Sequence, residues 1–123
     1  MFRNPICAFM WQPLSFIRQT MLVNSFSYLP VAIQKNGNSE WGLISDLQLA
    51  KYLRKEGIAS EEKLTQALQD AIRSKQIELH VAKVCRPQDS VESVLKMSDG
   101  LPTLVVSAEK KELLGIVTSF DLL

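Results

Sequence analysis

The residue types best suited to binding chemistry lie near the end of the chain, where an apolar segment leads into a helix start. Between Gly115 and Asp121 a buried strand is predicted to turn into a helix. This leaves backbone N–H groups free and points the positive end of the helix dipole at the turn, which suits an anion such as a phosphate. Thr118 adds a hydroxyl, and the Asp121 carboxylate, one helical turn later on the same side, can accept hydrogen bonds from a ribose diol.

The same spacing also has a purely structural explanation. Thr118-x-x-Asp121 and Ser45-x-x-Gln48 both fit a capping box, in which two side chains satisfy the free backbone groups of a helix start. Ligand binding and capping therefore both remain open for these pairs. Gln48 offers a neutral amide where Asp121 offers a carboxylate, and the weaker hydrogen bonds would lower affinity by roughly 1 kcal/mol, close to fivefold. We expect one strong site, at Thr118 and Asp121, and one weak or empty site at Ser45.

Other reactive residue types are too sparse for a catalytic or metal site. The chain has one histidine, His80, and two cysteines, Cys7 and Cys85, which lie far apart and without metal-ligand spacing. It has no Gly-rich phosphate loop and no triad pattern. We therefore expect no catalysis, no metal and no cofactor. We expect both cysteines to be free core thiols, and His80 to be a strand residue without a catalytic role.

The composition is that of one small globular domain. Its 123 residues carry 14 Lys and Arg against 13 Asp and Glu, a net charge of +1, and 46% are apolar. This balance is unlike that of nucleic-acid-binding proteins, and the apolar runs are too short for a signal peptide or a membrane span. We expect a cytoplasmic protein with neither nucleic-acid nor membrane partners. Residues 1–39 hold only three charged residues, so part of this segment is expected to be buried or to contact another copy.

Apolar periodicity predicts helices and strands in an order that occurs twice. The first unit comprises a helix over 13–24, strands over 29–33 and 41–44 joined by a turn at Asn36-Gly37, and a helix capped by Ser45 or Asp46 and ended by Gly57. One amphipathic helix over 60–75 follows. The second unit comprises a strand over 77–84, a helix capped by Asp89, strands over 101–106 and 113–118, and the start of a helix at Ser119.

The repeated order indicates an internal duplication. Pro30 and Gly42 of the first unit match Pro102 and Gly115 of the second, with hairpins of similar length. Neither half can bury both faces of a three-stranded sheet alone, so the halves are expected to pack around one shared core. The cleft between them is then the natural ligand pocket.

Two short motifs in register carry a family resemblance. Leu29-Pro30-Val31 with Gly42-Leu43-Ile44-Ser45, and Leu101-Pro102-Thr103 with the segment from Gly115 to Leu123, resemble the cystathionine β-synthase (CBS) domain, here as a tandem pair over nearly the whole chain. The resemblance implies a Bateman module, an α/β (α+β) fold of two β-α-β-β-α repeats about a pseudo-two-fold axis, usually in a homodimer. The implied division is a first repeat over 1–57, a connecting helix over 58–75, and a second repeat over 76–123 with its C-terminal helix truncated.

The resemblance also implies a function. Such modules are generally regulatory and not enzymes, and they bind an adenosine-containing ligand, here AMP, ADP, ATP or S-adenosylmethionine, between the repeats. The implied contacts of the stronger site are Gly115, Thr118, Ser119 and Asp121 at phosphate and ribose, Ala82, Val84 and Pro102 at adenine, and Arg86 at the phosphates. The implied weaker site comprises Ser45, Gln48 and Pro30.

Two alternatives remain open. The chain is expected either to bind such a ligand or to be a ligand-free dimerisation or protein-interaction module, in which both motifs only cap helices. It is also expected to act as the regulatory part of a larger enzyme or transporter if the catalytic part lies elsewhere. For Arg86, a solvated surface charge is the alternative to phosphate contact.

Overall fold

The computed structural model of the chain describes residues 6–35, 38–54, 60–90, 92, 101–107 and 112–117. Four predicted features lie outside these residues: the turn at Asn36-Gly37, the helix end at Gly57, most of the helix after Asp89, and the final helix from Ser119. The described helices and strands are β1 (Ala8–Phe9), α1 (Leu14–Asn24), β2 (Tyr28–Lys35), β3 (Asn38–Ser45), α2 (Asp46–Arg54), α3 (Ser60–Thr65), α4 (Leu68–Arg73), β4 (His80–Val81), β5 (Lys83–Cys85), β6 (Thr103–Val106) and β7 (Leu113–Val117).

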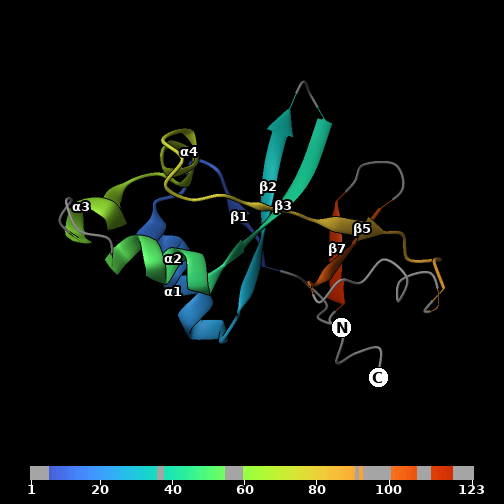
Figure 1. The fold of residues 1–123 in the computed structure, drawn as a ribbon. Helices are drawn as coiled ribbons and strands as arrows, with labels where there is room; N and C mark the ends of the chain where they lie inside the picture. Colours follow the sequence, from blue (N-terminus) through green and yellow to red (C-terminus); the bar gives the residue numbers. More distant parts are fainter. Residues whose placement is uncertain are drawn as a thin grey trace.

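Two small sheets carry the predicted duplication. The first has the strand order β1-β2-β3-β4 and the second has the order β5-β6-β7. In each, a short strand runs parallel to the next strand, which pairs antiparallel with the following one. The mixed α+β fold with two repeated halves is thereby confirmed (Figure 1). The sequence analysis missed β1, because a strand of two residues shows no periodicity.

The strand register corrects the sequence alignment of the two halves. Gly42 and Gly115 each lie opposite a valine of the preceding strand. Counting back three residues from each valine matches Tyr28 of the first half to Pro102 of the second. Pro30 lies two residues further along β2 and is fully buried. The two Leu-Pro pairs are therefore not structurally equivalent, although the glycines are.

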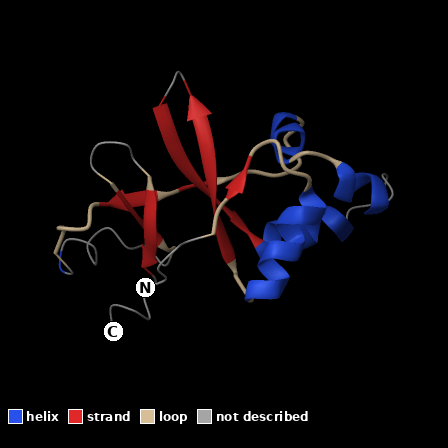
Figure 2. Ribbon diagram, turned by 180° about the vertical axis from the view of Figure 1, so that it is seen from behind, coloured by secondary structure: helices blue, strands red, loops and turns tan. Residues whose placement is uncertain are grey.

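The first sheet separates two apolar clusters. Leu43 and Ile44 are neighbours in β3 and point to opposite faces, as successive strand residues must. Ile44 packs with the helices, whereas Leu43 packs with residues of the second sheet, among them Leu104 and Ile116. Helices α1 to α4 lie on one side of the β2–β3 hairpin and the second sheet lies on the other (Figure 2). The two halves therefore share a core, as expected.

The helix α1 bears out the prediction over 13–24. Pro13 occupies the N-cap in an extended conformation, and Leu14, Ile17 and Met21 of the predicted stripe are buried. Leu22, which also belongs to that stripe, is 62% exposed. The apolar face of α1 is therefore wider than the part of it that the rest of the chain buries.

The prediction of a single helix over 60–75 is wrong. The segment forms two short helices, α3 and α4, with a break at Gln66 and Ala67. Ala67 is extended and forms a β-bridge with Pro13, and the Gln66 carbonyl accepts the Leu14 N–H at 2.9 Å. These hydrogen bonds to the start of α1 replace those that would continue the helix, so tertiary contacts override the local pattern.

The strand predicted over 77–84 is two short strands in different sheets. β4 pairs with β3 of the first sheet, and β5 pairs with β6 of the second. Between them, the Ala82 N–H donates to the Trp41 carbonyl at 3.4 Å. Ile77 is buried as the alternation implies, whereas Val81 is 87% exposed, because the chain crosses there from one sheet edge to the other.

Candidate functional site

The strand pairings bring parts of the predicted binding site to one end of the second sheet. β5 and β6 begin at this end and β7 ends there. Ala82 directly precedes β5, Pro102 directly precedes β6, and Gly115 is buried within β7. Three of the contacts predicted to hold phosphate and ribose, Thr118, Ser119 and Asp121, lie outside the described residues.

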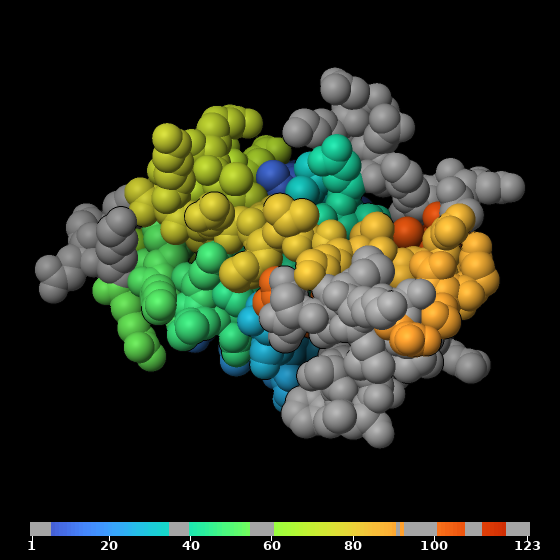
Figure 3. All heavy atoms as spheres, turned by 45° about the vertical axis from the view of Figure 1, so that its right-hand side comes forward, coloured from blue at the N-terminus to red at the C-terminus, as the bar shows by residue number. Residues whose placement is uncertain are grey.

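A cleft of about 490 Å³ lies where the two halves meet. Three predicted ligand contacts, Ala82, Val84 and Arg86, line it together, whereas Pro102 and Gly115 are not among its described lining residues. Figure 3 shows the segment that carries these three contacts as a continuous band across one face of the molecule. The other described lining residues are Glu40, Trp41, Val81, Cys85, Asp89, Val106 and Ser107.

Arg86 is held by Asp89 in the turn after β5. The Asp89 carboxylate accepts the backbone N–H of Arg86 at 2.7 Å, and the Asp89 N–H donates to the Arg86 carbonyl at 3.0 Å. Their side chains also form an ion pair, with 4.0 Å between Arg86 Nε and Asp89 Oδ1. The Asp89 carboxylate, which was predicted to cap the helix after it, thus closes the turn between Arg86 and Asp89. The Arg86 side chain is 59% exposed.

The negative charge of Asp89 reaches the cleft. The buried Cys85 thiol lines the cleft, and its pKa is raised above the usual range by burial and, to a smaller extent, by the Asp89 carboxylate. The pKa of the half-buried Cys7 thiol is raised by burial alone. Both cysteines are free, as predicted, and a raised pKa keeps a thiol protonated and unreactive near neutral pH.

In the first half, Ser45 caps a helix. Its hydroxyl is buried at the end of β3 and accepts the backbone N–H of Gln48 at 3.1 Å, which is the N-cap arrangement. The Gln48 Oε1 is buried and has no hydrogen-bond partner among the described residues. Pro30 is fully buried and so presents no surface to a ligand. Helix capping therefore accounts for Ser45 in the Ser45-x-x-Gln48 motif.

His80 packs as a strand residue should. Its ring meets the Tyr28 ring edge to face, with 6.0 Å between the centroids. Within the described ranges, no group of three or more His, Cys, Asp or Glu residues is arranged to hold a metal ion. Across that same part of the chain, no helix is both long enough and apolar enough to cross a membrane.

The sequence analysis missed the cleft residues that the first half supplies. Glu40 and Trp41 lie in β3, far from β5 along the chain, and they reach the cleft because β3 pairs with β4. No local pattern marks them. Asp89 was singled out only as a cap, although its spacing of three residues from Arg86 is compatible with the observed turn and ion pair.

Solved structures with similar folds match nearly the whole chain. Protein MJ1225 from Methanocaldococcus jannaschii matches with a TM-score of 0.73 and 21% identity, over 99% of this chain but 44% of its own length. A CBS domain-containing protein of unknown function from Bacillus anthracis matches with a TM-score of 0.73 and 17% identity, over 99% and 85%. The CBS domain of the bacterial CNNM/CorC family Mg²⁺ transporter, solved in complex with ATP, matches with a TM-score of 0.71 and 16% identity, over 99% and 80%. No protein-family model and no curated protein sequence matches the chain.

Proposed function

We propose that this chain, which has the fold of a tandem pair of CBS domains, is a non-catalytic regulatory module that binds an adenosine-containing ligand between its halves. The observation that carries the proposal is the cleft at the junction, which brings together Ala82, Val84 and Arg86. The likeness to a CBS domain solved with ATP supports the ligand class. We place the protein in the cytoplasm, where its free thiols stay reduced.

Adenine stacks against the apolar wall of the cleft in this proposal. Ala82 and Val84 supply that wall, and the 41% exposure of Val84 leaves its side chain accessible to a ligand. The substituent on the sugar lies toward Arg86, which lines the same cleft. The sugar is the proposed contact of Thr118 and Asp121, which follow β7 in the sequence. The ligand is AMP, ADP, ATP or S-adenosylmethionine. The Ser45 hydroxyl already serves as a cap, so the first half contributes the weaker site.

Regulation follows from the position of the cleft. Its walls come from β3 of the first sheet and from β5 and β6 of the second, so a ligand there contacts both halves. A ligand shifts a conformational equilibrium only if it binds one arrangement better than another. A molecule that touches both halves meets this condition whenever their relative position changes.

Thermal unfolding with and without ligand tests the proposal. A compound at 1 mM with a dissociation constant near 10 µM stabilises the folded state by about 2.7 kcal/mol, or roughly 10 °C in Tm for a domain of this size. Val84→Trp fills the cleft and should abolish the shift. Leu114→Trp is the matched control, because Leu114 is similarly exposed, at 43%, but is not among the described residues that line the cleft.

The result also separates the alternatives. If AMP, ADP, ATP and S-adenosylmethionine all leave the Tm unchanged, the chain is a ligand-free interaction module. If one compound binds, Asp121→Ala distinguishes ligand contact from helix capping. Loss of a ligand contact lowers the affinity, whereas loss of a cap lowers only the Tm of the free protein.

We also propose that the chain forms a homodimer through α1 and α2. These helices expose large apolar side chains, with Phe16 at 52%, Leu22 at 62%, Val23 at 69% and Leu47 at 61%. Leu22 additionally lines a groove of about 430 Å³ between α1 and α2. Exposed apolar side chains of this kind mark association surfaces when they gather in one region.

Sedimentation velocity tests the dimer. The unmodified chain should sediment as a dimer, and Leu22→Glu should sediment as a monomer because it places a charge in the contact. Val81→Glu is the control, since Val81 is 87% exposed on the far edge of the first sheet. A dimer that survives Leu22→Glu, or a monomeric unmodified chain, contradicts this surface.

A further inference from the structure

The cleft is poorly suited to a polyphosphate. Its described charged lining residues are one guanidinium, Arg86, and two carboxylates, Glu40 and Asp89, which leaves a net charge of 1 − 2 = −1. Phosphate groups are held by free cations and backbone N–H groups. Here the cation is already paired with a carboxylate, and the remaining carboxylate repels an anion.

Asp89 is anchored beside the Arg86 side chain. The carboxylate is anchored by the 2.7 Å hydrogen bond from the Arg86 backbone N–H, and the 4.0 Å ion pair then joins the two side chains. The Asp89 side chain is 28% exposed and that of Arg86 is 59% exposed. The acid is therefore the more buried partner, and a phosphate must compete with it for the guanidinium.

The Asp89 carboxylate also acts on the neighbouring Cys85 thiol. The Asp89 charge contributes to raising the Cys85 pKa, which means that it disfavours an anion at that point of the cleft. A ligand phosphate in the same place meets the same field. Trp41 also lines the cleft, and an indole ring favours a cation.

Resting on the proposed function, we propose that Asp89 is a specificity-determining residue of the cleft. It disfavours polyphosphates, so that the adenosine ligand carries a neutral or cationic substituent, such as the sulfonium of S-adenosylmethionine. Arg86 serves mainly to hold Asp89 and the turn after β5. The cleft then discriminates among adenosine compounds by charge, while its apolar wall binds the shared adenine.

Calorimetric titration of the full chain with ATP, adenosine and S-adenosylmethionine tests this assignment. The unmodified chain should bind S-adenosylmethionine more tightly than ATP. Asp89→Asn should strengthen ATP binding and weaken S-adenosylmethionine binding, each by roughly fivefold for a unit charge about 8 Å away at an effective dielectric constant near 40. The asparagine oxygen can still accept the Arg86 N–H, so the turn is retained.

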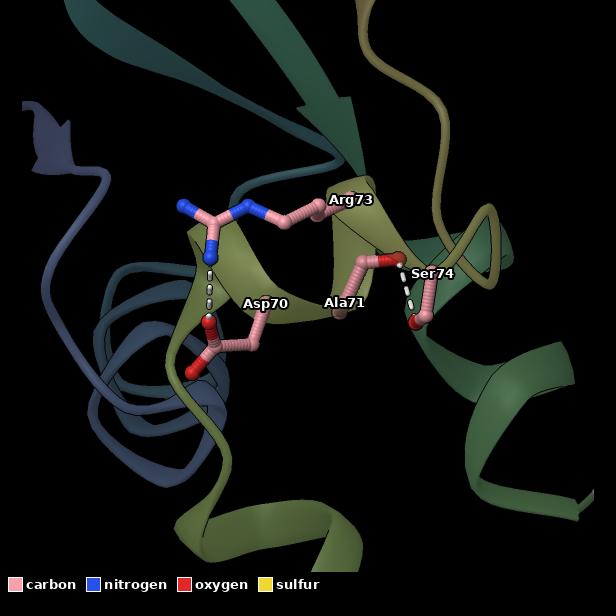
Figure 4. A network of polar contacts seen from close by, with 4 residues as sticks. All are labelled: Asp70, Ala71, Arg73 and Ser74. Atoms are coloured by element: carbon pink, nitrogen blue, oxygen red, sulfur yellow. Dashed lines mark hydrogen bonds and ion pairs between the residues drawn. The ribbon is translucent and has the colours of Figure 1, made fainter.

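The chain offers a matched control in α4. Asp70 and Arg73 form an ion pair with the same spacing of three residues, at 3.6 Å between Oδ1 and an Arg73 terminal nitrogen, on an exposed helix surface (Figure 4). Neither residue is among the described residues that line the cleft. Asp70→Asn removes the same charge and should leave all three affinities unchanged.

A measurement on the unmodified chain keeps the test independent of folding. Added salt screens repulsion between ATP and the cleft, so the ratio of ATP affinity to adenosine affinity should rise with salt. The assignment is overturned if ATP binding weakens with salt and falls about tenfold in Arg86→Ala. It is also overturned if the ratio of ATP affinity to S-adenosylmethionine affinity is the same in Asp89→Asn as in the unmodified chain. If none of the three compounds binds, the proposed function fails and this inference fails with it.

Discussion

Truncation of Leu43 to alanine tests whether one core holds the two halves together. Leu43 is fully buried, and it comes from the first sheet while its cluster includes Leu104, Val106 and Ile116 of the second. Removing three carbons costs about 2.4 kcal/mol of transfer free energy, at roughly 0.8 kcal/mol per methylene. The remaining cavity brings the expected loss to about 3 to 4 kcal/mol.

Urea unfolding provides the assay, with two signals followed together. Circular dichroism reports mainly helices α1 to α4, which lie on the first-sheet side. Trp41 fluorescence reports the shared core, because its side chain packs against the Leu43 cluster, and a Trp11→Phe background removes the other indole, which is 66% exposed. With a slope near 1.5 kcal/mol per M, both transitions should move about 2 M lower together.

Val81→Ala is the control for this prediction. Val81 is 87% exposed in β4 and lies outside the proposed dimer surface, so its truncation should change the unfolding free energy by less than about 0.5 kcal/mol. The reasoning is refuted if Leu43→Ala costs less than about 1 kcal/mol, a value at the low end even for smaller truncations. It is also refuted if the two signals separate, because the halves then unfold independently.

Three further changes have defined outcomes. Ser45→Ala should lower the free energy of unfolding by about 1 kcal/mol, because the start of α2 loses its cap. Lys63→Ala should lower it by about 1 to 3 kcal/mol, because Lys63 is 2% exposed and its Nζ donates to a backbone carbonyl of α2 at 3.0 Å. In a Cys7→Ser background, alkylation of Cys85 should follow a pH curve displaced upward from that of a free cysteine. Since thiolate forms only near and above the thiol pKa, Asp89→Asn should move this curve to lower pH.

Each of these changes has its own check. Ser45→Asp should keep most of the stability, because aspartate also caps helices, and an equal loss in both variants would rule out the cap. Lys51→Ala is the control for Lys63→Ala, since Lys51 is exposed on α2. For Cys85, an alkylation curve that Asp89→Asn leaves in place would show that burial alone raises the thiol pKa.

The local features of the fold were predictable because short segments specify them. The stripe of Leu14, Ile17 and Met21 predicted α1, and the apolar runs that flank a two-residue turn predicted the β2–β3 hairpin. Ser45 followed three residues later by Gln48 predicted the cap that the structure contains. The recurrence of this order predicted the duplication and the shared core, because neither half has enough apolar surface to fold alone.

Other features depended on partners distant in the chain. The break before α4 depends on the bridge between Ala67 and Pro13, and no pattern within 60–75 encodes it. The two-residue β1 exists only through its pairing with β2. The exposure of Val81 follows from the crossing of the chain between two sheets.

The candidate site shows the same division. The sequence by itself predicted the duplication, because periodicity and spacing are local properties of the chain, and the family resemblance of its motifs implied the fold class and three residues that line the cleft. Only the tertiary structure placed Trp41 and Glu40 at the same cleft as Val84 and joined the charges of Arg86 and Asp89 there. The physical reason is that strand pairing and electrostatic interaction act between groups that are close in space, and the chain order alone does not specify which groups those are.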